Sequence, residues 1–311
     1  MCCDAAENRI DAAGSKDRKK LIIVAGPTAT GKTALGVRLA KDLDGEIISA
    51  DSMQVYRHMD IGTAKVTAEE MQGIPHHMLD VADPTQNYSI AEYKSAAKQC
   101  LEEITARGHL PIVVGGTCFY IHALLYDSEF EESDTGGIVR SRLEAEGAEK
   151  GAAYMHEKLR AIDPASAESI HANNRKRVIR ALEFFELNGY PISEHNRREH
   201  EKPSPYDFIF LALQREREAL YRAIDERVDR MVAAGLWEER KKLRELGADE
   251  SCISMQGIGY KEDTAEEIKQ NSRHYSKKQM TWLKRERDVT WIQSPVTEED
   301  YQWILQKCMR L

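Results

Sequence analysis

The sequence lacks any apolar run that approaches the roughly 20 residues of a membrane-spanning helix, and its first residues lack the apolar core of a signal peptide. Its six cysteines form no C-x-x-C pair, which argues against a zinc site and favours reduced thiols. Internal repeats and low-complexity tracts are absent as well. These absences predict a globular, cytoplasmic protein without membrane attachment, in which residues 1–19 form a disordered leader.

The net charge of −8, taken alone, argues against a polyanionic partner. The charge is unevenly distributed, however, because basic residues gather in two segments. They are Arg175, Lys176, Arg177 and Arg180 in the first segment, and Arg273, Lys277, Lys278, Lys284, Arg285 and Arg287 in the second. Local basic patches matter more for nucleic-acid binding than the total charge, so a nucleic-acid partner stays open.

The chain of 311 residues is too long for one small core and predicts a main domain with an insertion. Five short, β-rich apolar runs recur along it, separated mostly by helical patterns, notably over 90–106 and 220–246. The runs are Leu21–Ala25, Glu46–Ala50, Leu110–Val114, Phe208–Leu213 and Val289–Ile292. This alternation predicts an α/β fold with a parallel sheet flanked by helices. A long helical stretch predicts an insertion domain at 127–197, which leaves 20–126 and 198–311 as the core.

The most informative motif is Gly26-Pro27-Thr28-Ala29-Thr30-Gly31-Lys32-Thr33, which fits G-x-x-x-x-G-K-[ST]. It follows the first predicted strand and precedes a helical pattern, which is the context of a phosphate-binding P-loop. Backbone N–H groups would face an anion, Lys32 would neutralise phosphate oxygens, and the Thr33 hydroxyl would reach a Mg²⁺ ion. The motif predicts a P-loop NTPase-like core and a phosphorylated ligand, without saying which ligand binds or whether a phosphoryl group moves.

Three further side chains are expected near this ligand, because open α/β sheets bind ligands beyond the carboxyl ends of their strands. Asp51 follows the second strand and is a candidate general base or Mg²⁺ ligand, with a helix N-cap as its structural alternative. Thr117 follows the third strand and could position a substrate or simply close a turn. Arg217 follows the fourth strand and could clamp a diphosphate or lie solvated at a helix start.

One acid that phosphoryl transfer requires is missing. A typical P-loop NTPase has an apolar strand that ends in an aspartate, which helps to hold Mg²⁺. The third strand here leads into Gly115, Gly116 and Thr117 instead, and Asp51 is the only strand-end acid at hand. A bound diphosphate is therefore expected to be a leaving group rather than a donor of phosphate.

The motifs together resemble those of the tRNA dimethylallyltransferase family, in its bacterial form, from about residue 20 to about residue 292. They are GPTATGKT at 26–33, DSMQVYRHMDIGTAK at 51–65, PHHMLDV at 75–81, GGTCFY at 115–120, NRKRVIRALE at 174–183, SMQGIGYKE at 254–262 and RHYSKKQMTW at 273–282. Many enzymes share a P-loop, but the DSMQVYR, DIGTAK and PHHM series is far more specific.

The resemblance implies that a dimethylallyl group passes from dimethylallyl diphosphate to N6 of an adenosine beside the tRNA anticodon, with release of diphosphate. The P-loop would hold the donor's diphosphate together with Mg²⁺ at Thr33, with Asp51 as an optional second ligand. Asp51 matches the family's general base, Thr117 matches a residue that contacts the adenosine, and Arg217 matches an arginine linked to donor binding. Ala223 departs from the pattern, since many relatives carry an arginine there.

The family's helical insertion grips the anticodon stem-loop, so the resemblance also implies a set of tRNA-binding residues. The set comprises Asp51, Ser52, Met53, Gln54, Thr117, Arg140, Lys176, Arg177, Arg180, Gln256, Lys261, Arg273, Lys277 and Lys278. The last three would contact phosphates, and a solvated basic helix face is their alternative. The enzyme is expected to act as a monomer.

Three other functions stay open. An adenylate isopentenyltransferase would use a free nucleotide, but the helical insertion and the basic 273–287 segment argue against it. A P-loop kinase would transfer phosphate, but the missing strand-end acid argues against that. An RNA-binding NTP switch would bind RNA tightly without forming a modified base.

Overall fold

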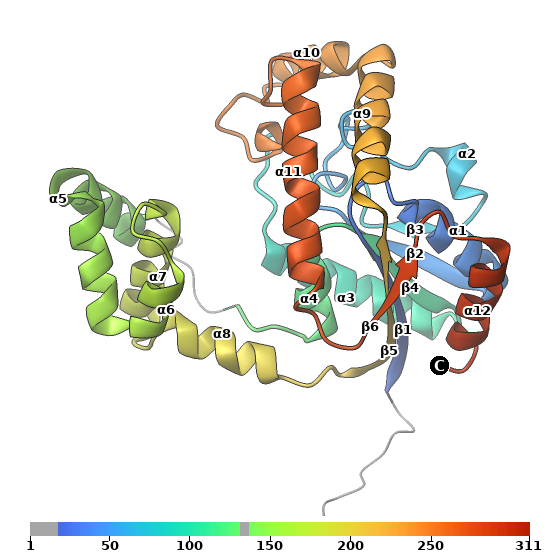
Figure 1. Ribbon diagram of the computed structural model, residues 1–311, viewed down its shortest axis with the longest axis horizontal. Helices are drawn as coiled ribbons and strands as arrows, with labels where there is room; N and C mark the ends of the chain where they lie inside the picture. The colour runs from blue at the N-terminus through green and yellow to red at the C-terminus, as the bar shows by residue number, and fades with distance from the viewer. Residues whose placement is uncertain (1–17, 131–136) are drawn as a thin grey trace, which may run out of the picture. The chain divides into compact units, whose positions relative to one another are not determined.

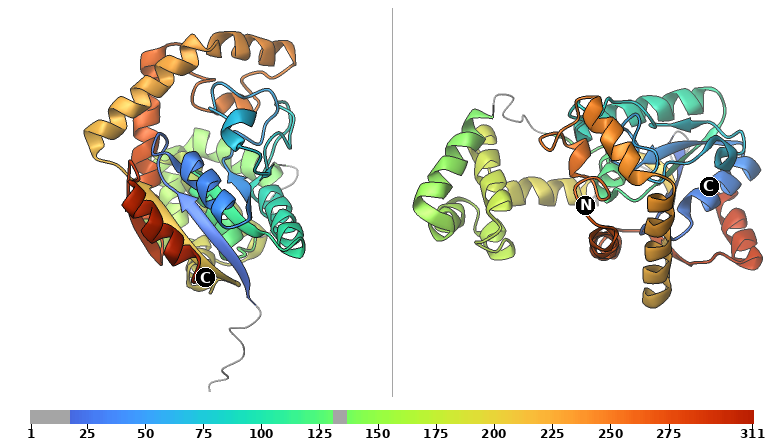
Figure 2. Two further views of the ribbon diagram at one scale, coloured as in Figure 1. Left: turned by 90° about the vertical axis from the view of Figure 1, so that its right-hand side faces the viewer. Right: turned by 90° about the horizontal axis from the view of Figure 1, so that it is seen from above.

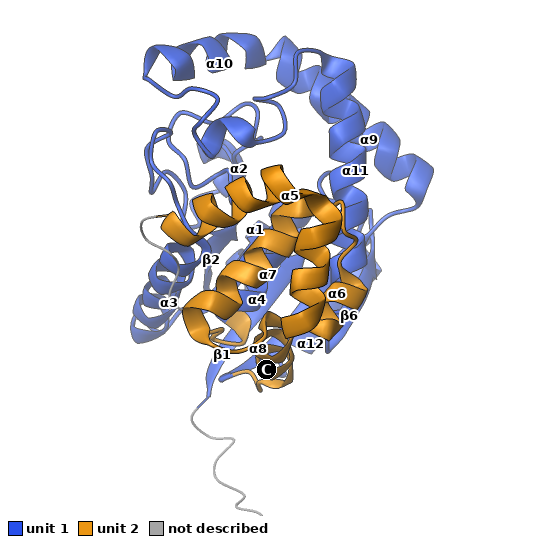
Figure 3. Ribbon diagram, turned by 90° about the vertical axis from the view of Figure 1, so that its left-hand side faces the viewer, with its two compact units in different colours: residues 1–124, 205–311 blue, residues 125–204 orange. Residues whose placement is uncertain are grey.

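The computed structural model describes residues 18–130 and 137–311, so the predicted leader lies outside the described residues except for its last two positions (Figure 1). Figure 3 colours the two compact units of the chain. One unit comprises the described residues up to Leu124 together with Pro205–Leu311, and the other is Leu125–Ser204. The insertion predicted at 127–197 falls within the second unit.

A six-stranded parallel sheet in the order β3-β2-β4-β1-β5-β6 forms the centre of the first unit (Figure 1). The strands are β1 (Lys19–Ala25), β2 (Gly45–Ala50), β3 (His76–His77), β4 (Leu110–Gly115), β5 (Tyr206–Gln214) and β6 (Val289–Gln293). All five predicted runs are confirmed as strands. The two-residue strand β3 was not predicted, because it is too short to carry a periodic pattern.

Helices α1 (Lys32–Asp42), α3 (Ile90–Ala106) and α12 (Glu298–Cys308) pack against this sheet. The first unit also contains α2 (Ala68–Met71), α4 (Cys118–Leu125), α9 (Arg217–Ala233), α10 (Leu236–Glu245) and α11 (Ala265–Leu283). The single helical pattern expected over 220–246 proves to be two helices, because Gly235 adopts φ 101° between α9 and α10. Figure 2 shows α9 and α11, which pack against each other.

The core follows from the side-chain alternation of the central strand. Ile22 and Val24 of β1 pack in one cluster with residues of α1 and α12, among them Leu35, Leu39 and Ile304. On the other face, α3 buries one stripe of residues at helical spacing, namely Tyr93, Ala97, Leu101 and Ile104. Each large apolar side chain so buried stabilises the fold by about 1.5–3 kcal/mol.

The second unit is helical and has its own core. It contains α5 (Ile138–Ile162), α6 (Pro164–Ser169), α7 (Arg175–Asn188) and α8 (Ile192–Glu201), around a cluster that includes Leu143, Leu159, Val178 and Leu182. The two ends of the unit meet, since the Ser204 hydroxyl donates a hydrogen bond to the carbonyl oxygen of Leu125 at 2.7 Å. In the part of the chain that the structure describes, no helix is both long and apolar enough to cross a bilayer.

Candidate active site

The loop 26–33 joins β1 to α1 and is shaped by two glycines. Gly26 has φ 151°, and a Cβ atom there would lie 2.7 Å from the carbonyl oxygen of Leu213, so a larger residue does not fit. Gly31 precedes α1 in the left-handed conformation, with φ 85°, and no side chain caps the helix. The first N–H groups of α1 are thus available to an anion, as the motif predicts.

A central cavity of about 460 Å³ lies beyond the carboxyl ends of the strands. Its lining brings together many of the sequence-predicted residues: Thr28, Lys32, Thr33, Asp51, Ser52, Met53, Gln54, Gln256, Lys261 and Lys278. Helices α9 and α11 complete the wall with side chains that include Arg227, Tyr275 and Gln279. Segments up to 250 residues apart in the sequence therefore face one space, which also contains Gly115 and Gly116 after β4.

Asp51 serves two purposes in this cavity. Its Oδ1 accepts hydrogen bonds from the backbone N–H groups of Met53 at 2.9 Å and Gln54 at 3.4 Å, so the capping role named as its alternative is present. Among the residues that the structure describes, Oδ2 has no hydrogen-bond partner. One carboxylate oxygen thus holds the turn while the other is available to a ligand.

Thr117 ties the end of β4 to the turn that carries Asp51. Its Oγ1 accepts a hydrogen bond from the Ser52 N–H at 2.9 Å and donates one to the Ser52 hydroxyl at 3.2 Å. The Tyr275 hydroxyl from α11 also interacts with Thr117, and burial raises the pKa of Tyr275. Thr117 itself is not among the residues that line the central cavity.

Glu239 was missed by the sequence reasoning, although it shapes one wall of the cavity. This buried carboxylate on α10 accepts three backbone N–H bonds, from Asp60 at 2.8 Å, Ile61 at 2.7 Å and Gly62 at 3.0 Å. The Tyr260 hydroxyl donates to it at 2.7 Å. No local pattern in the sequence could signal this role, because the three N–H groups lie almost 180 residues away.

Gln279 was missed as well, although it lies inside the RHYSKKQMTW motif. Its Oε1 accepts a hydrogen bond from the Thr28 N–H at 3.2 Å, and its Nε2 donates one to the Gly116 carbonyl oxygen at 2.8 Å. The side chain is only 4% exposed. A Cβ atom on Gly116 would lie 2.4 Å from Nε2, so the glycine is needed for this bridge.

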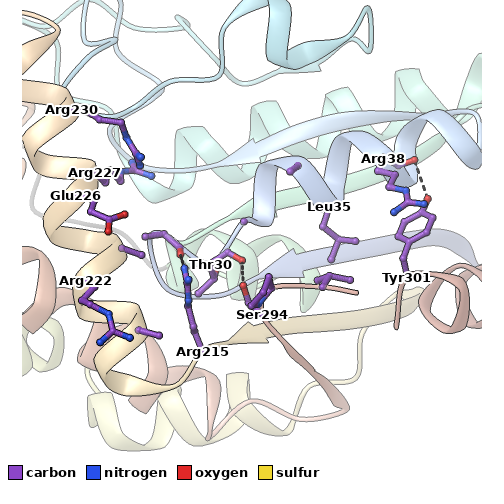
Figure 4. Close-up of a pocket in the computed structure, with 17 residues that line it drawn as sticks. Thr30, Leu35, Arg38, Arg215, Arg222, Glu226, Arg227, Arg230, Ser294 and Tyr301 are labelled. Carbon is purple, nitrogen blue, oxygen red and sulfur yellow. Dashed lines mark hydrogen bonds between the residues drawn. The ribbon is translucent and has the colours of Figure 1, made fainter. Parts of the chain in front are cut away.

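A second cavity of about 610 Å³ lies along the other side of the P-loop and is rich in arginine (Figure 4). Its lining includes Arg38, Arg215, Arg222, Arg227 and Arg230, the single acid Glu226, and the loop residues Ala29, Thr30 and Gly31. We call it the arginine cavity. Arg215, which follows β5, reaches the carbonyl oxygen of Ala29 at 3.5 Å. Arg227 lines both cavities.

Electrostatics also link Lys32 with Arg227. Burial and, to a smaller extent, the charge of Arg227 lower the pKa of Lys32 to about 8, while Asp51 acts in the opposite direction. Burial also lowers the pKa of Arg227. A positive field thus converges on the loop where the sequence predicts a phosphorylated ligand.

The candidate Arg217 lies elsewhere. It is exposed at the start of α9, where its guanidinium is 5.4 Å from the centre of the Tyr221 ring. It is among the lining residues of neither cavity. This position fits the solvated alternative, and Arg215 and Arg227 lie where a diphosphate clamp was expected.

Several basic candidates for tRNA contact form ion pairs within the protein. Arg140 and Arg180 both pair with the buried carboxylate of Glu183, at 2.6 and 3.2 Å. Arg273 pairs with Asp225 at 2.5 Å. The Tyr221 hydroxyl has a lowered pKa, because Arg217 and Lys277 hydrogen-bond to it. Lys176 and Arg177 on α7 are exposed.

The donor set offers little to a permanently bound metal. In residues 18–130 and 137–311, no group of three or more His, Cys, Asp and Glu side chains could hold an ion. Thr33 and Asp51 both line the central cavity and present oxygen atoms. This set fits Mg²⁺, which commonly takes one or two protein oxygens and completes its shell with substrate phosphates and water.

Comparison with known proteins gives a consistent result. The family model described as IPP transferase matches residues 54–286. A tRNA dimethylallyltransferase of Lachnoclostridium phytofermentans is 47% identical over 90% of this chain and 92% of its own length. The crystal structure of a full-length tRNA isopentenylpyrophosphate transferase from Bacillus halodurans is 41% identical, with a TM-score of 0.68 over 94% of this chain and 99% of that one. A eukaryotic dimethylallyltransferase acting on tRNA has a TM-score of 0.76 at 30% identity, over 94% of this chain and 77% of that one.

Proposed function

This chain belongs to the IPP transferase family, and we propose from this premise that its central cavity is where dimethylallyl diphosphate meets N6 of an adenosine in tRNA. The chain transfers the dimethylallyl group to tRNA and has the P-loop NTPase-like fold of its structural neighbours. One observation carries the assignment of the site: Asp51 and Gln54 line the same cavity as Lys32 and Thr33 of the P-loop. The residues expected to contact the adenosine and those expected to hold the diphosphate therefore line one space.

The donor's diphosphate lies on the loop 26–33, where the free N–H groups of α1 and the charge of Lys32 attract it. The arginine cavity on the other side of the loop supports this position, because it adds cationic charge where the diphosphate would extend. Thr33 is the residue that would hold Mg²⁺, since the available oxygen of Asp51 serves as the base. The ion, when bound, would neutralise part of the charge on the diphosphate.

Asp51 is the general base of the transfer. The allylic C–O bond breaks and its electron pair leaves with the diphosphate, while N6 of the adenosine forms the new C–N bond. The proton that N6 loses passes to the available oxygen of Asp51. Thr117 keeps the Asp51 turn in place through its two hydrogen bonds with Ser52.

The acceptor is the anticodon stem-loop of tRNA. An adenine must leave its stack to enter a cavity of this kind, and a loop nucleotide does so at a lower cost than a paired one. The exposed basic residues Lys176 and Arg177 of the helical unit would bind the RNA backbone, together with Lys261 and Lys278 at the cavity. We expect a monomer to be active.

A competition assay tests this function. The enzyme receives labelled dimethylallyl diphosphate with AMP and an anticodon stem-loop side by side, and we expect label on the stem-loop and release of diphosphate. Preferred labelling of AMP would support the adenylate isopentenyltransferase instead. Transfer of label from γ-labelled ATP to any acceptor would support a P-loop kinase. RNA binding without formation of a modified base would support an RNA-binding NTP switch.

A further inference from the structure

Two half-buried cations lie beside the central cavity without a carboxylate partner. The Lys32 ammonium donates a hydrogen bond to the Pro27 carbonyl oxygen at 2.7 Å, and Arg227 donates one to the Thr63 carbonyl oxygen at 3.0 Å. Within residues 18–130 and 137–311, neither side chain forms an ion pair. Buried charges are normally paired, because desolvation is costly. This arrangement is suited to an anion that both cations can bind.

Arg227 is the cation that spans the two cavities. It projects from α9 into the lining of both, close to Arg230 and above the loop in Figure 4. Ala223 lies one turn earlier on the same face of α9 and lines the arginine cavity without a charge. Arg227 therefore supplies a guanidinium on this face, whereas the exposed Arg217 lies outside both cavities.

We propose that Arg227 is a catalytic residue that donates hydrogen bonds to the donor's diphosphate as the allylic C–O bond breaks. This inference rests on the proposed function, in which the diphosphate occupies the loop 26–33. Negative charge grows on the leaving oxygen in that step, because the electron pair of the broken bond remains with the diphosphate. A guanidinium presents a planar fork of N–H donors that fits such oxygens, and its field is strongest in a site that excludes water.

The test begins with calorimetric measurement of the binding of inorganic diphosphate to the wild type and to four variants, namely Arg227→Gln, Arg227→Lys, Arg244→Gln and Lys32→Ala. We expect Arg227→Gln to weaken diphosphate binding about 10- to 100-fold. Its single-turnover rate with saturating donor and tRNA should fall about 10²- to 10³-fold. Arg227→Lys keeps the charge without the fork and should recover part of both losses. Arg244→Gln alters an exposed arginine on α10 and should behave as the wild type.

A comparison of binding with folding separates this role from mere support of the Thr63 backbone, to which Arg227 donates a hydrogen bond. Arg227→Gln should weaken diphosphate binding while its melting temperature stays near that of the wild type. A variant that only loosens the loop would melt at a lower temperature, and Arg227→Lys would then recover no diphosphate binding.

Two outcomes are decisive. Unchanged diphosphate affinity and an unchanged single-turnover rate in Arg227→Gln would overturn the role of Arg227. The proposed function fails in a different way, namely when Lys32→Ala binds diphosphate as tightly as the wild type. Loss of binding in Lys32→Ala but not in Arg227→Gln would therefore refute this inference alone.

Discussion

The amide of Gln279 bridges the backbone N–H of Thr28 in the P-loop, at 3.2 Å, and the carbonyl oxygen of Gly116 after β4, at 2.8 Å. One side chain of α11 thereby fixes the donor-binding loop against the strand end that carries Thr117. We expect Gln279→Met, which matches the shape but loses both hydrogen bonds, to raise the KM for dimethylallyl diphosphate about 10-fold, since each unpaired buried group costs about 1–3 kcal/mol.

Steady-state kinetics with varied donor and saturating stem-loop measure this effect. Gln270→Met changes an exposed residue of the same helix and serves as the matched control. Gly116→Ala should act on the same bridge, because its Cβ would displace Nε2, so the two changes should be far from additive. Strict additivity would mean that the bridge does not hold the loop.

Asp51→Asn isolates the proton-accepting role of this residue from its capping role. The amide oxygen can still accept the Met53 N–H, so the turn should stay folded. We expect the single-turnover rate to fall by about 10²–10⁴ while affinity for tRNA stays near that of the wild type. Quenched-flow kinetics and fluorescence anisotropy with labelled stem-loop give the two values. A rate close to wild type would remove Asp51 as the base.

The lowered pKa of Lys32 predicts a pH dependence. In the proposed site Lys32 would bind diphosphate as the ammonium, and its pKa of about 8 means that the free enzyme loses this charge as the pH rises through 8. The value of kcat/KM for the donor, which reports groups of the free enzyme, should therefore decline above about pH 8. Lys32→Arg stays protonated at this pH, so whatever activity it keeps should lack this decline. A profile that is flat to pH 10 in the wild type would contradict the prediction.

Glu239 should contribute to stability through the loop that it holds. Gln at this position has one accepting oxygen and an NH₂ group that faces the N–H donors of Asp60, Ile61 and Gly62. We expect Glu239→Gln to lower the free energy of unfolding by about 1–3 kcal/mol. Urea denaturation followed by circular dichroism measures the loss. The exposed neighbour provides a control, since Glu238→Gln should change the free energy by less than about 0.5 kcal/mol.

The exposed basic pair on α7 should bind RNA through charge. We expect the double variant Lys176→Gln, Arg177→Gln to weaken stem-loop binding and to reduce the slope of log K against log salt by about 1–2. The KM for the donor should not change. Lys41→Gln, in the last turn of α1 and so at the opposite edge of the sheet from the strand ends, is the control. Equal salt slopes for the double variant and the wild type would exclude these two residues from the RNA contact.

Local pattern was enough to predict the P-loop and the five longer strands. The loop needs glycine at Gly26 and Gly31 for its backbone, and each buried strand reads as a short apolar run, so both leave a signal in consecutive residues. The predicted meeting of Asp51 with Lys32 followed from topology alone, since the carboxyl ends of parallel strands share one edge.

Residues that act across long distances in the sequence left no such signal. Gln279 and Glu239 each hold backbone groups more than 150 residues away, and nothing about a glutamine or glutamate on an amphipathic helix distinguishes them from their solvated neighbours. Arg227 is equally ordinary in sequence, one of several arginines on α9. Only the packing of α9 over the P-loop distinguishes it from Arg217.

The hydrogen bond between Ser204 and Leu125 has a consequence for engineering. The helical unit leaves and rejoins the chain at neighbouring points, so a short turn could span the gap at a small entropic cost and leave the six-stranded scaffold connected. We therefore expect that residues 125–204 can be exchanged as a cassette, and that a different unit in their place would alter which acceptor is prenylated.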